Sequence, residues 1–342
     1  MPDTAAGWKN RVRQGLPLVG LAVLLAYFFR TLDRQRVTEA IHQADMLAFA
    51  TVAVVSVAVV WVYDALCLTW LLRTTLGHRG HPQALGLRQL LPIKAASYLI
   101  NIVNYHAAAM GMAWLVGRRK GVSFIEAAGA LGLLSYLDII AVTAMSMAGV
   151  WMAPEFFGPY PELQGWLKMV ALVVFAGALS GALVIQSRWQ LPLVVRLRAF
   201  APLRPLAALR PQAMLVGVAL RSVLILLYAA AAFYSMRAFQ MQPQWGRLFI
   251  ALPIITVVGT LPISVSGVGS TQLLMRQFYA PFVVTAATAG PVIDAFSTLQ
   301  IAAYLVCRVA LALPFFGPIA SELRQRPADL GQADAEPAKA ES

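Results

Sequence analysis

The chain has 342 residues, of which 59% are hydrophobic and 12% are charged, and its formal net charge at pH 7 is +12. A soluble protein of this length would carry roughly twice that share of charged residues, so the composition excludes a soluble globular fold. The basic residues are scattered beside apolar runs, which is the pattern that orients membrane proteins and not one that binds nucleic acid. The sequence therefore predicts an all-α integral membrane protein with no nucleic-acid partner.

Eight apolar segments follow one another along a single polytopic transmembrane domain over 16–316, and a helix that crosses a bilayer needs about 20 residues. The first segment, 16–32, follows a basic N-terminus (1–15) that we expect to be cytoplasmic. No small-x-small cleavage site comes after it, so we expect a retained helix and not a signal peptide. The small, polar residues 317–342 are expected to form a disordered cytoplasmic tail. The other segments are 46–72, 90–117, 122–150, 162–186, 212–236, 248–280 and 290–316.

Segments 90–117 and 248–280 are predicted to be re-entrant hairpins, and the other six to be full crossings. Two of the 27 Lys and Arg residues, Arg221 and Arg308, fall inside the membrane. With eight simple crossings the remainder divides 13 to 12 between the two sides, whereas two re-entrant segments divide it 18 to 7. The positive-inside rule prefers the second arrangement and places both termini in the cytoplasm of a bacterial cell, at its inner membrane.

Each of these two segments also carries a break near its middle. The first has a polar centre, "NIVNYH" (101–106), and the second is interrupted at Pro253 and again through Pro262–Gly269. Proline removes a helix hydrogen-bond donor and glycine weakens a helix. Non-helical backbone is tolerated at membrane depth only inside protein or beside a water-filled cavity. We therefore expect both tips to line one cavity near the midplane, in an inverted repeat.

Charged residues in the middle of a span are the strongest functional signal, because a buried ionised group in a membrane is costly and is usually paired or faces water. Asp138 and Arg221 lie near the midpoints of their predicted spans and are close enough to the same depth to pair. They are interpreted either as a site for a headgroup or a proton, or as a structural ion pair between two helices. Asp64 has two interpretations as well, a partner for Arg73 or a role in transport, and Arg308 is expected to extend to the membrane interface.

Polar residues at the predicted cavity complete the candidate substrate-binding set. The histidine at the first tip is interpreted either as part of this site or as a packing residue. The glycine-rich second tip is interpreted either as part of this site or as a close crossing of helices. No Lys follows the second glycine of that stretch, which excludes a nucleotide loop. No metal-ligand spacing, cofactor motif or nucleophile–base set is present, so we expect neither metal nor cofactor nor enzymatic activity. The set is Asn104, His106, Asp138, Arg221, Ser264, Ser266, Gly267, Gly269, Ser270, Gln272 and Asp294.

Two stretches resemble the signatures of a known family. "NYHAAAMGMAWLVGRRKGVSFIEAAGALGLLSYLDIIAV" (104–142) is similar to the first signature of the flippase-like family typified by the lysylphosphatidylglycerol synthase transmembrane region. "PISVSGVGSTQ" (262–272) is similar to its second, Pro-x-Ser-x-Gly-Gly-x-Gly-x-x-Glu. The resemblance covers most of 10–320 in order and spacing. It implies a membrane protein that handles lipid headgroups, with a separate lipid-synthesising enzyme as a candidate partner.

The sequence departs from this family at charged positions. Residues 108–112 are Ala-Ala-Met-Gly-Met where the family carries Arg and Glu, Leu134-Ser135 replaces a Glu-Arg pair, and Gln272 replaces the closing Glu. These neutral residues weaken the expectation of a strongly charged substrate, and they are typical of a degenerate or re-specialised member.

The sequence predicts the movement of a lipid or lipid-linked headgroup between leaflets through a polar midplane cavity. The alternatives are a proton-coupled secondary transporter of a small solute and a non-transporting accessory subunit of a lipid-modifying enzyme. A basic, proline-broken stretch over 188–211 is expected to lie on anionic lipid at the inner surface. A homo-oligomer is a further candidate assembly.

Overall fold

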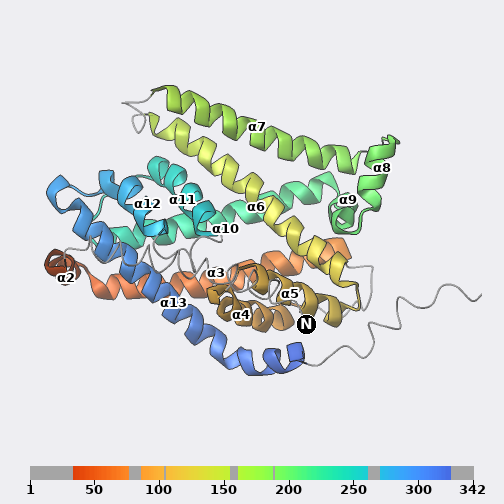
Figure 1. Ribbon diagram of the computed structural model, residues 1–342, viewed down its shortest axis with the longest axis horizontal. Helices are drawn as coiled ribbons and strands as arrows, with labels where there is room; N and C mark the ends of the chain where they lie inside the picture. Colours follow the sequence, from red (N-terminus) through yellow and green to blue (C-terminus); the bar gives the residue numbers. More distant parts are fainter. Residues whose placement is uncertain are drawn as a thin grey trace, which may run out of the picture.

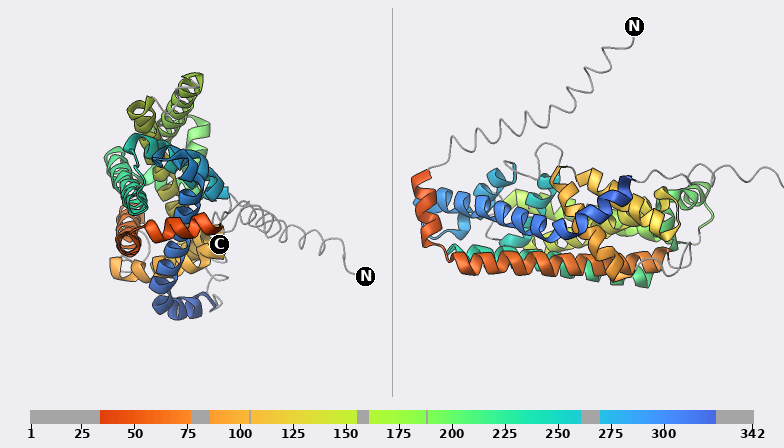
Figure 2. Two further views of the ribbon diagram at one scale, coloured as in Figure 1. Left: turned by 90° about the vertical axis from the view of Figure 1, so that its left-hand side faces the viewer. Right: turned by 90° about the horizontal axis from the view of Figure 1, so that it is seen from below.

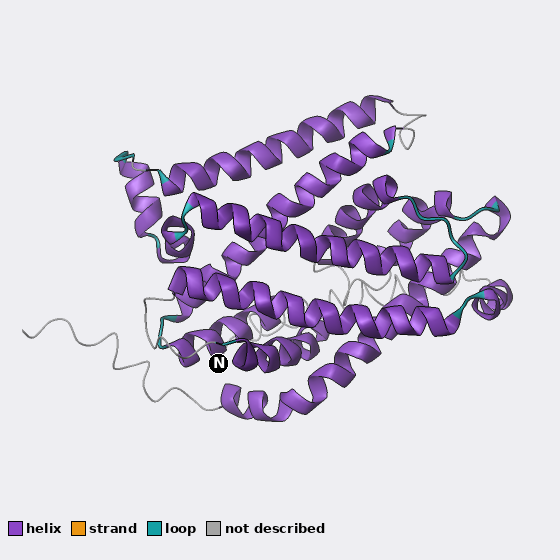
Figure 3. Ribbon diagram, turned by 180° about the vertical axis from the view of Figure 1, so that it is seen from behind, coloured by secondary structure: helices purple, strands orange, loops and turns teal. Residues whose placement is uncertain are grey.

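The computed structural model describes residues 34–76, 86–103, 105–154, 161–187, 189–260 and 270–324. Every regular element in these ranges is a helix (Figure 3). Five of the helices are long and apolar enough to cross a membrane: α3 (Met46–Leu76), α6 (Phe124–Met152), α7 (Pro161–Gln186), α10 (Pro211–Ala238) and α13 (Ala286–Arg324). The chain is therefore a multi-pass, all-helical membrane protein over the part described.

These five helices coincide with five of the six predicted full crossings. The sixth, 16–32, and the N-terminus at 1–15 lie outside the described residues. A short helix that was not predicted, α2 (Arg34–Gln43), packs on α13 and runs across one end of the bundle (Figure 2).

The predicted disordered tail begins too early in the sequence. Helix α13 continues to Arg324, past the expected end at residue 316, because its last turn is held by an ion pair. Arg119 Nη2 lies 2.6 Å from a carboxylate oxygen of Glu322, and Arg119 Nε donates to the other oxygen at 3.0 Å. These hydrogen bonds hold the pKa of the Glu322 carboxyl below its usual value. Residues 325–342 lie outside the described part.

The long helices lie side by side and bring the loops to two ends of the bundle (Figure 1). One end, which we term the basic end, carries the last turns of α3 and α13, the first turns of α6 and α10, and the short helices α8 (Pro192–Ala199), η2 (Ala201–Leu203) and α9 (Arg204–Ala208). Its basic side chains are Arg73, Arg88, Arg118, Arg119, Lys120, Arg196, Arg198, Arg204 and Arg210.

Helices α4 (Leu87–Val103) and α5 (Tyr105–Lys120) pack on each other as a hairpin, and residue 104 between them lies outside the described residues. Arg119 donates to the backbone carbonyl of Gln89 at 3.3 Å, so the start of α4 and the end of α5 lie together at the basic end. At 1.5 Å per residue each helix is roughly 25 Å long, shorter than the ~30 Å hydrocarbon core of a bilayer.

Helices α11 (Trp245–Thr260) and α12 (Ser270–Tyr279) form the second pair, and they also pack on each other. Gln242 N–H donates to the carbonyl of Phe282, in the short helix η3 (Ala280–Phe282), at 2.7 Å, so this pair starts and finishes at the end opposite the basic end. The predicted tip over 261–269 lies outside the described residues. The two pairs thus begin from opposite ends of the bundle (Figure 1). That each pair enters the membrane and returns to the same side stays a prediction.

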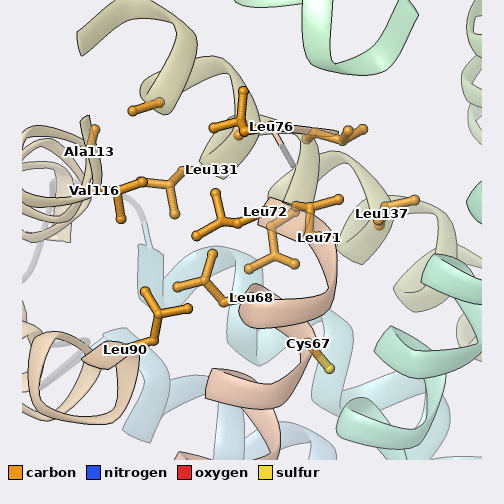
Figure 4. Packing of buried hydrophobic residues seen from close by; sticks show 14 of the residues in the cluster. Cys67, Leu68, Leu71, Leu72, Leu76, Leu90, Ala113, Val116, Leu131 and Leu137 are labelled. Carbon is orange, nitrogen blue, oxygen red and sulfur yellow. The ribbon is translucent and has the colours of Figure 1, made fainter. Parts of the chain in front are cut away.

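The main hydrophobic core lies around the half of α3 that faces the basic end. Leu68, Leu71 and Leu72 are spaced to share one helix face and are at most 1% exposed. They meet Leu90 of the first hairpin and Leu131 of α6 (Figure 4). Helix α7, by contrast, packs on α6, α8 and α9 at the edge of the bundle and leaves most of its apolar side chains uncovered by protein.

The second helix pair is anchored to α6 by a close crossing of two backbones. A Cβ atom added at Gly149 would lie 2.8 Å from the carbonyl oxygen of Gly246, and one added at Gly246 would lie 2.9 Å from the Cβ of Met152. Only glycine allows α6 and α11 to approach so closely, which is a common use of small residues between membrane helices.

We expect Gly149→Ala to destabilise the protein by about 1–3 kcal/mol, because the new methyl group forces the two backbones apart. Gly132→Ala on the same helix is the matched control, since nothing lies within 4 Å of its Cβ position and alanine favours a helix over glycine. Reversible unfolding in mixed micelles measures both variants. A Gly149→Ala protein as stable as Gly132→Ala would contradict the close crossing.

Candidate functional site

Arg221 is the centre of a charged network in the interior of the bundle. Its Nη2 donates to Asp138 Oδ2 at 2.6 Å and its Nε donates to Asp138 Oδ1, so the guanidinium holds the α6 carboxylate through both oxygens. Its Nη1 donates to Asp64 Oδ1 on α3 at 2.5 Å. The other oxygen of Asp64 lies 2.5 Å from Lys94 Nζ on α4. Four helices therefore meet at two carboxylates and two cations whose formal charges cancel.

Local packing brings these side chains within reach of one another. Gly217, one helical turn before Arg221, lets α10 approach α6 and α3, because a Cβ there would lie 2.8 Å from Leu137 and 3.1 Å from Trp70. Tyr63 Oη donates to the backbone carbonyl of Leu220 at 3.1 Å and fixes α3 against α10 beside Arg221. The network thus sits at a close junction of α3, α6 and α10.

The hairpin residue Lys94 is held in place in a similar way. Trp61 on α3 donates its indole N–H to the backbone carbonyl of Leu91 on α4 at 3.0 Å. This contact lies within one helical turn of Asp64 on α3 and within one turn of Lys94 on α4, so it holds the two helices together beside the pair. The first hairpin is thereby tied to the long helices by both a hydrogen bond and a charge pair.

The network is covered by protein on one side and open on the other. The side chains of Asp64 and Arg221 are each 8% exposed and that of Lys94 is 14% exposed, whereas the side chain of Asp138 is 33% exposed. Removing an ion from water costs several kcal/mol even after relaxation, and this cost is offset only when the charges are paired and hydrogen-bonded. Asp138 is therefore the residue of the network that can exchange its partner at the lowest cost in free energy.

A second charged cluster lies between α12 and α13. Arg276 on α12 donates from Nη2 to Asp294 Oδ2 at 2.6 Å and from Nε to Oδ1. Gln272, one turn earlier on α12, donates from Nε2 to Thr298 Oγ1 on α13 at 3.4 Å. Asp294 is 3% exposed and Gln272 is also 3% exposed, so both polar groups lie at a covered helix interface.

Comparison with models of known protein families shows the family to which the chain belongs. A model of the lysylphosphatidylglycerol synthase TM region matches residues 15–307. The chain belongs to this family. The comparisons with curated proteins and with solved structures gave no match. The family is defined by a membrane domain that is associated with lipid-related functions.

In this family member the structure brings the predicted site residues together in two groups. Asp138 and Arg221 form the pair that their midspan positions suggested, and Gln272 and Asp294 both lie along the α12–α13 interface. Asn104 and the second tip lie outside the described residues, as do the side chains of His106 and Ser270. The tip residues in question are Ser264, Ser266, Gly267 and Gly269.

Two partners of the network were missed or misassigned from the sequence. Asp64 does not pair with Arg73, because the Arg73 side chain is exposed at the end of α3 while Lys94 and Arg221 reach the carboxylate directly. Lys94 lies within the predicted re-entrant segment 90–117 and was not identified from the sequence as a partner of Asp64. The signal that identifies it is its place inside an apolar run, "LLPIKAASYLI", where an ionised group needs a partner.

We expect Asp64→Asn to destabilise the protein by about 3–5 kcal/mol, because it leaves Lys94 without its carboxylate and Arg221 with one partner fewer in a buried position. Asp138→Asn is expected to cost less, about 1–3 kcal/mol, since Arg221 keeps Asp64 and the substituted side chain is half-exposed. Reversible unfolding of the two variants in mixed micelles gives the comparison. Equal losses of stability would show that the two carboxylates are equivalent and that the network has no open side.

Proposed function

We propose that this protein moves a lipid, or a lipid-linked polar headgroup, between the two leaflets of a bacterial inner membrane. The observation that carries the proposal is the neutral charge network with one half-exposed carboxylate, Asp138, at the midpoint of α6. A polar headgroup in hydrocarbon loses its hydrogen bonds to water, at a cost of several kcal/mol for each unsatisfied group. A site that supplies charged hydrogen-bonding partners at mid-depth lowers that cost.

The network favours an exchange of partners in the transfer step. Arg221 holds two carboxylates, so an anionic headgroup oxygen can take the place of Asp138 while Asp64 keeps the guanidinium oriented. Asp138, once released, accepts hydrogen bonds from hydroxyl or ammonium groups of the same headgroup. The acyl chains remain in the bilayer throughout, beside the parts of α6 and α7 that no protein covers.

The two hairpins would provide the moving parts. Half-depth helices that enter from opposite faces and meet near the midplane are typical of transporters with inverted repeats, in which one element rocks against another around a fixed site. Lys94 on the first pair contacts the network, and Arg276 on the second pair contacts Asp294 near the other end. Each pair is thus connected by charge to a long helix, and the breaking of such a contact would accompany opening.

The basic end is proposed to face the cytoplasm, following the positive-inside rule. Helix α8 adds an amphipathic element there, with Arg196 and Arg198 among apolar side chains that the protein leaves uncovered. Trp189 is 58%, Leu193 69% and Phe200 58% exposed. Apolar groups that enter the acyl boundary beside cationic groups at headgroup level would favour an anionic inner leaflet.

We expect Asp138→Asn to slow lipid translocation about tenfold or more, because the headgroup loses a charged hydrogen-bond partner. The measurement is the rate at which a fluorescent phospholipid in the inner leaflet of reconstituted vesicles becomes reducible by external dithionite. Glu126→Gln is the matched control, since Glu126 pairs with Arg204 at 3.5 Å at the end of the bundle, away from the network.

The outcome also separates the two alternatives from lipid translocation. Wild-type protein that leaves lipid in place but carries a solute with protons would indicate a secondary transporter. Wild-type protein that moves neither would favour an accessory subunit. Full lipid translocation by Asp138→Asn would make the Asp138–Arg221 pair a structural one.

The proposed re-entrant topology predicts which positions an impermeant maleimide labels. In a background with Cys67 and Cys307 replaced by alanine, single cysteines at Arg88 and Arg118 should react from the same, cytoplasmic side, because they flank the first hairpin at the basic end. A cysteine at Val284, which is 73% exposed at the other end, should react only from the periplasmic side. Labelling of positions 88 and 118 from opposite sides would show that 90–117 crosses the membrane.

A further inference from the structure

Arg308 stands in contrast to the other deep arginine of the bundle. It lies about one helical turn from the middle of the apolar part of α13, Thr288–Ile319. Arg221 has two carboxylate partners, whereas Arg308 has no ion pair or hydrogen bond within the described residues. The structure places its guanidinium over the ring of Tyr98, 5.4 Å from the ring centre. The expectation that Arg308 extends to the membrane interface is therefore wrong, because the aromatic face of α4 holds it inward.

Arg308 lines a narrow pocket in which the other polar groups are hydroxyls. Four helices contribute to it, with Ser56 from α3, Tyr98 from α4, Tyr228 from α10 and Tyr304 from α13, together with three apolar side chains. No carboxylate is among the described residues that line the pocket. The Ser56 and Tyr304 hydroxyls lie 3.2 Å apart, and the hydroxyls of Tyr98 and Tyr228 make no hydrogen bond within the described residues. The described lining of the pocket thus provides one positive charge and several hydroxyl donors but no anion.

A cation at this depth is costly unless an anion or water compensates it. Contact with an aromatic face recovers part of that cost, but the guanidinium still has its five N–H donors. A planar guanidinium matches the oxygens of a phosphate, which it binds through two parallel hydrogen bonds. Tyrosine and serine hydroxyls can donate to the remaining oxygens.

The pocket adjoins the charge network on three helices. Ser56 is eight residues from Asp64 on α3, Tyr98 is four from Lys94 on α4, and Tyr228 is seven from Arg221 on α10. Residues at these spacings share a helix face one to two turns apart. Because α3 runs opposite to α4 and α10, all three displacements point away from the basic end (Figure 1). The pocket is the next polar position beyond the network.

We infer that this pocket binds a phosphate oxyanion, with Arg308 as the charged ligand and the Tyr98 hydroxyl as a donor. There is room for about one water molecule, so an oxygen of the phosphate enters while the rest of the molecule stays outside. Tyr228, which is 40% exposed, forms part of the uncovered rim. We assign the phosphate to a phospholipid headgroup at mid-depth in the membrane, an assignment that rests on the proposed function. A free phosphate ion would offer the same oxygens to the pocket.

The test is the affinity of full-length protein in detergent for short-chain phosphatidylglycerol, measured by native mass spectrometry. Arg308→Gln should weaken binding at least about tenfold, which corresponds to the loss of a charge-assisted hydrogen bond. Tyr98→Phe keeps the ring under the guanidinium and removes the hydroxyl, so it should weaken binding several-fold. Arg237→Gln is the matched control, since Arg237 also lies over an aromatic ring, that of Phe233 at 5.9 Å, but outside the pocket.

Two further probes identify the source. Uncharged dihexanoylglycerol should not compete, and inorganic phosphate should bind more weakly than the lipid. Inorganic phosphate that binds as tightly as the lipid, and loses affinity in Arg308→Gln, would support the oxyanion site and assign it to free phosphate. Competition by dihexanoylglycerol, or unchanged lipid binding in both Arg308→Gln and Tyr98→Phe, would overturn the inference.

These outcomes are separate from those of the transport assay. A wild-type protein that binds phosphatidylglycerol through Arg308 but moves no lipid would remove the proposed function and leave the oxyanion site. A protein that moves lipid through Asp138 while Arg308→Gln binds normally would leave the proposed function and remove the site.

Discussion

The pairing of Arg221 with Asp138 and Asp64 is the interaction on which the rest of the structure depends. Three long helices that are apolar along most of their length can slide and rotate against one another at little cost, because lipid tails are as apolar as their side chains. A guanidinium that holds two carboxylates at hydrogen-bond distance fixes their mutual depth and rotation. Lys94 extends this constraint to the first hairpin, so one neutral set of four charges sets the position of four helices.

The two short helix pairs are attached to the bundle in different ways. The first pair joins the central network directly, through Lys94. The second pair is held by a glycine crossing with α6 and by the Arg276–Asp294 pair with α13. A charge contact can be exchanged for a polar ligand, whereas a backbone crossing resists separation. The second pair therefore has a backbone contact with the bundle in addition to its charge contact.

The long helices were predictable from the sequence because length and hydropathy decide them. The Asp138–Arg221 pair was predictable as well, since both residues lie near midspan and neither can remain ionised alone. The partners of Asp64 were not predictable, because only the packing of α4 and α10 on α3 brings Lys94 and Arg221 to the carboxylate. Arg308 was misplaced for a similar reason. Side-chain length permits it to reach the interface, and the position of Tyr98 on another helix decides that it does not.

The order of the charged residues along the chain has a consequence for biosynthesis. Asp64 would enter the membrane as a bare anion with α3, yet the next helix to leave the ribosome carries Lys94, its own counter-charge. Asp138 then arrives with α6 and leaves the charge network one negative charge in excess until α10 delivers Arg221. Since chains are made from the N-terminus, this interval is the vulnerable one. A ribosome that stalls between α6 and α10 would leave a fragment with an uncompensated carboxylate in the bilayer, which membrane quality control should recognise and degrade.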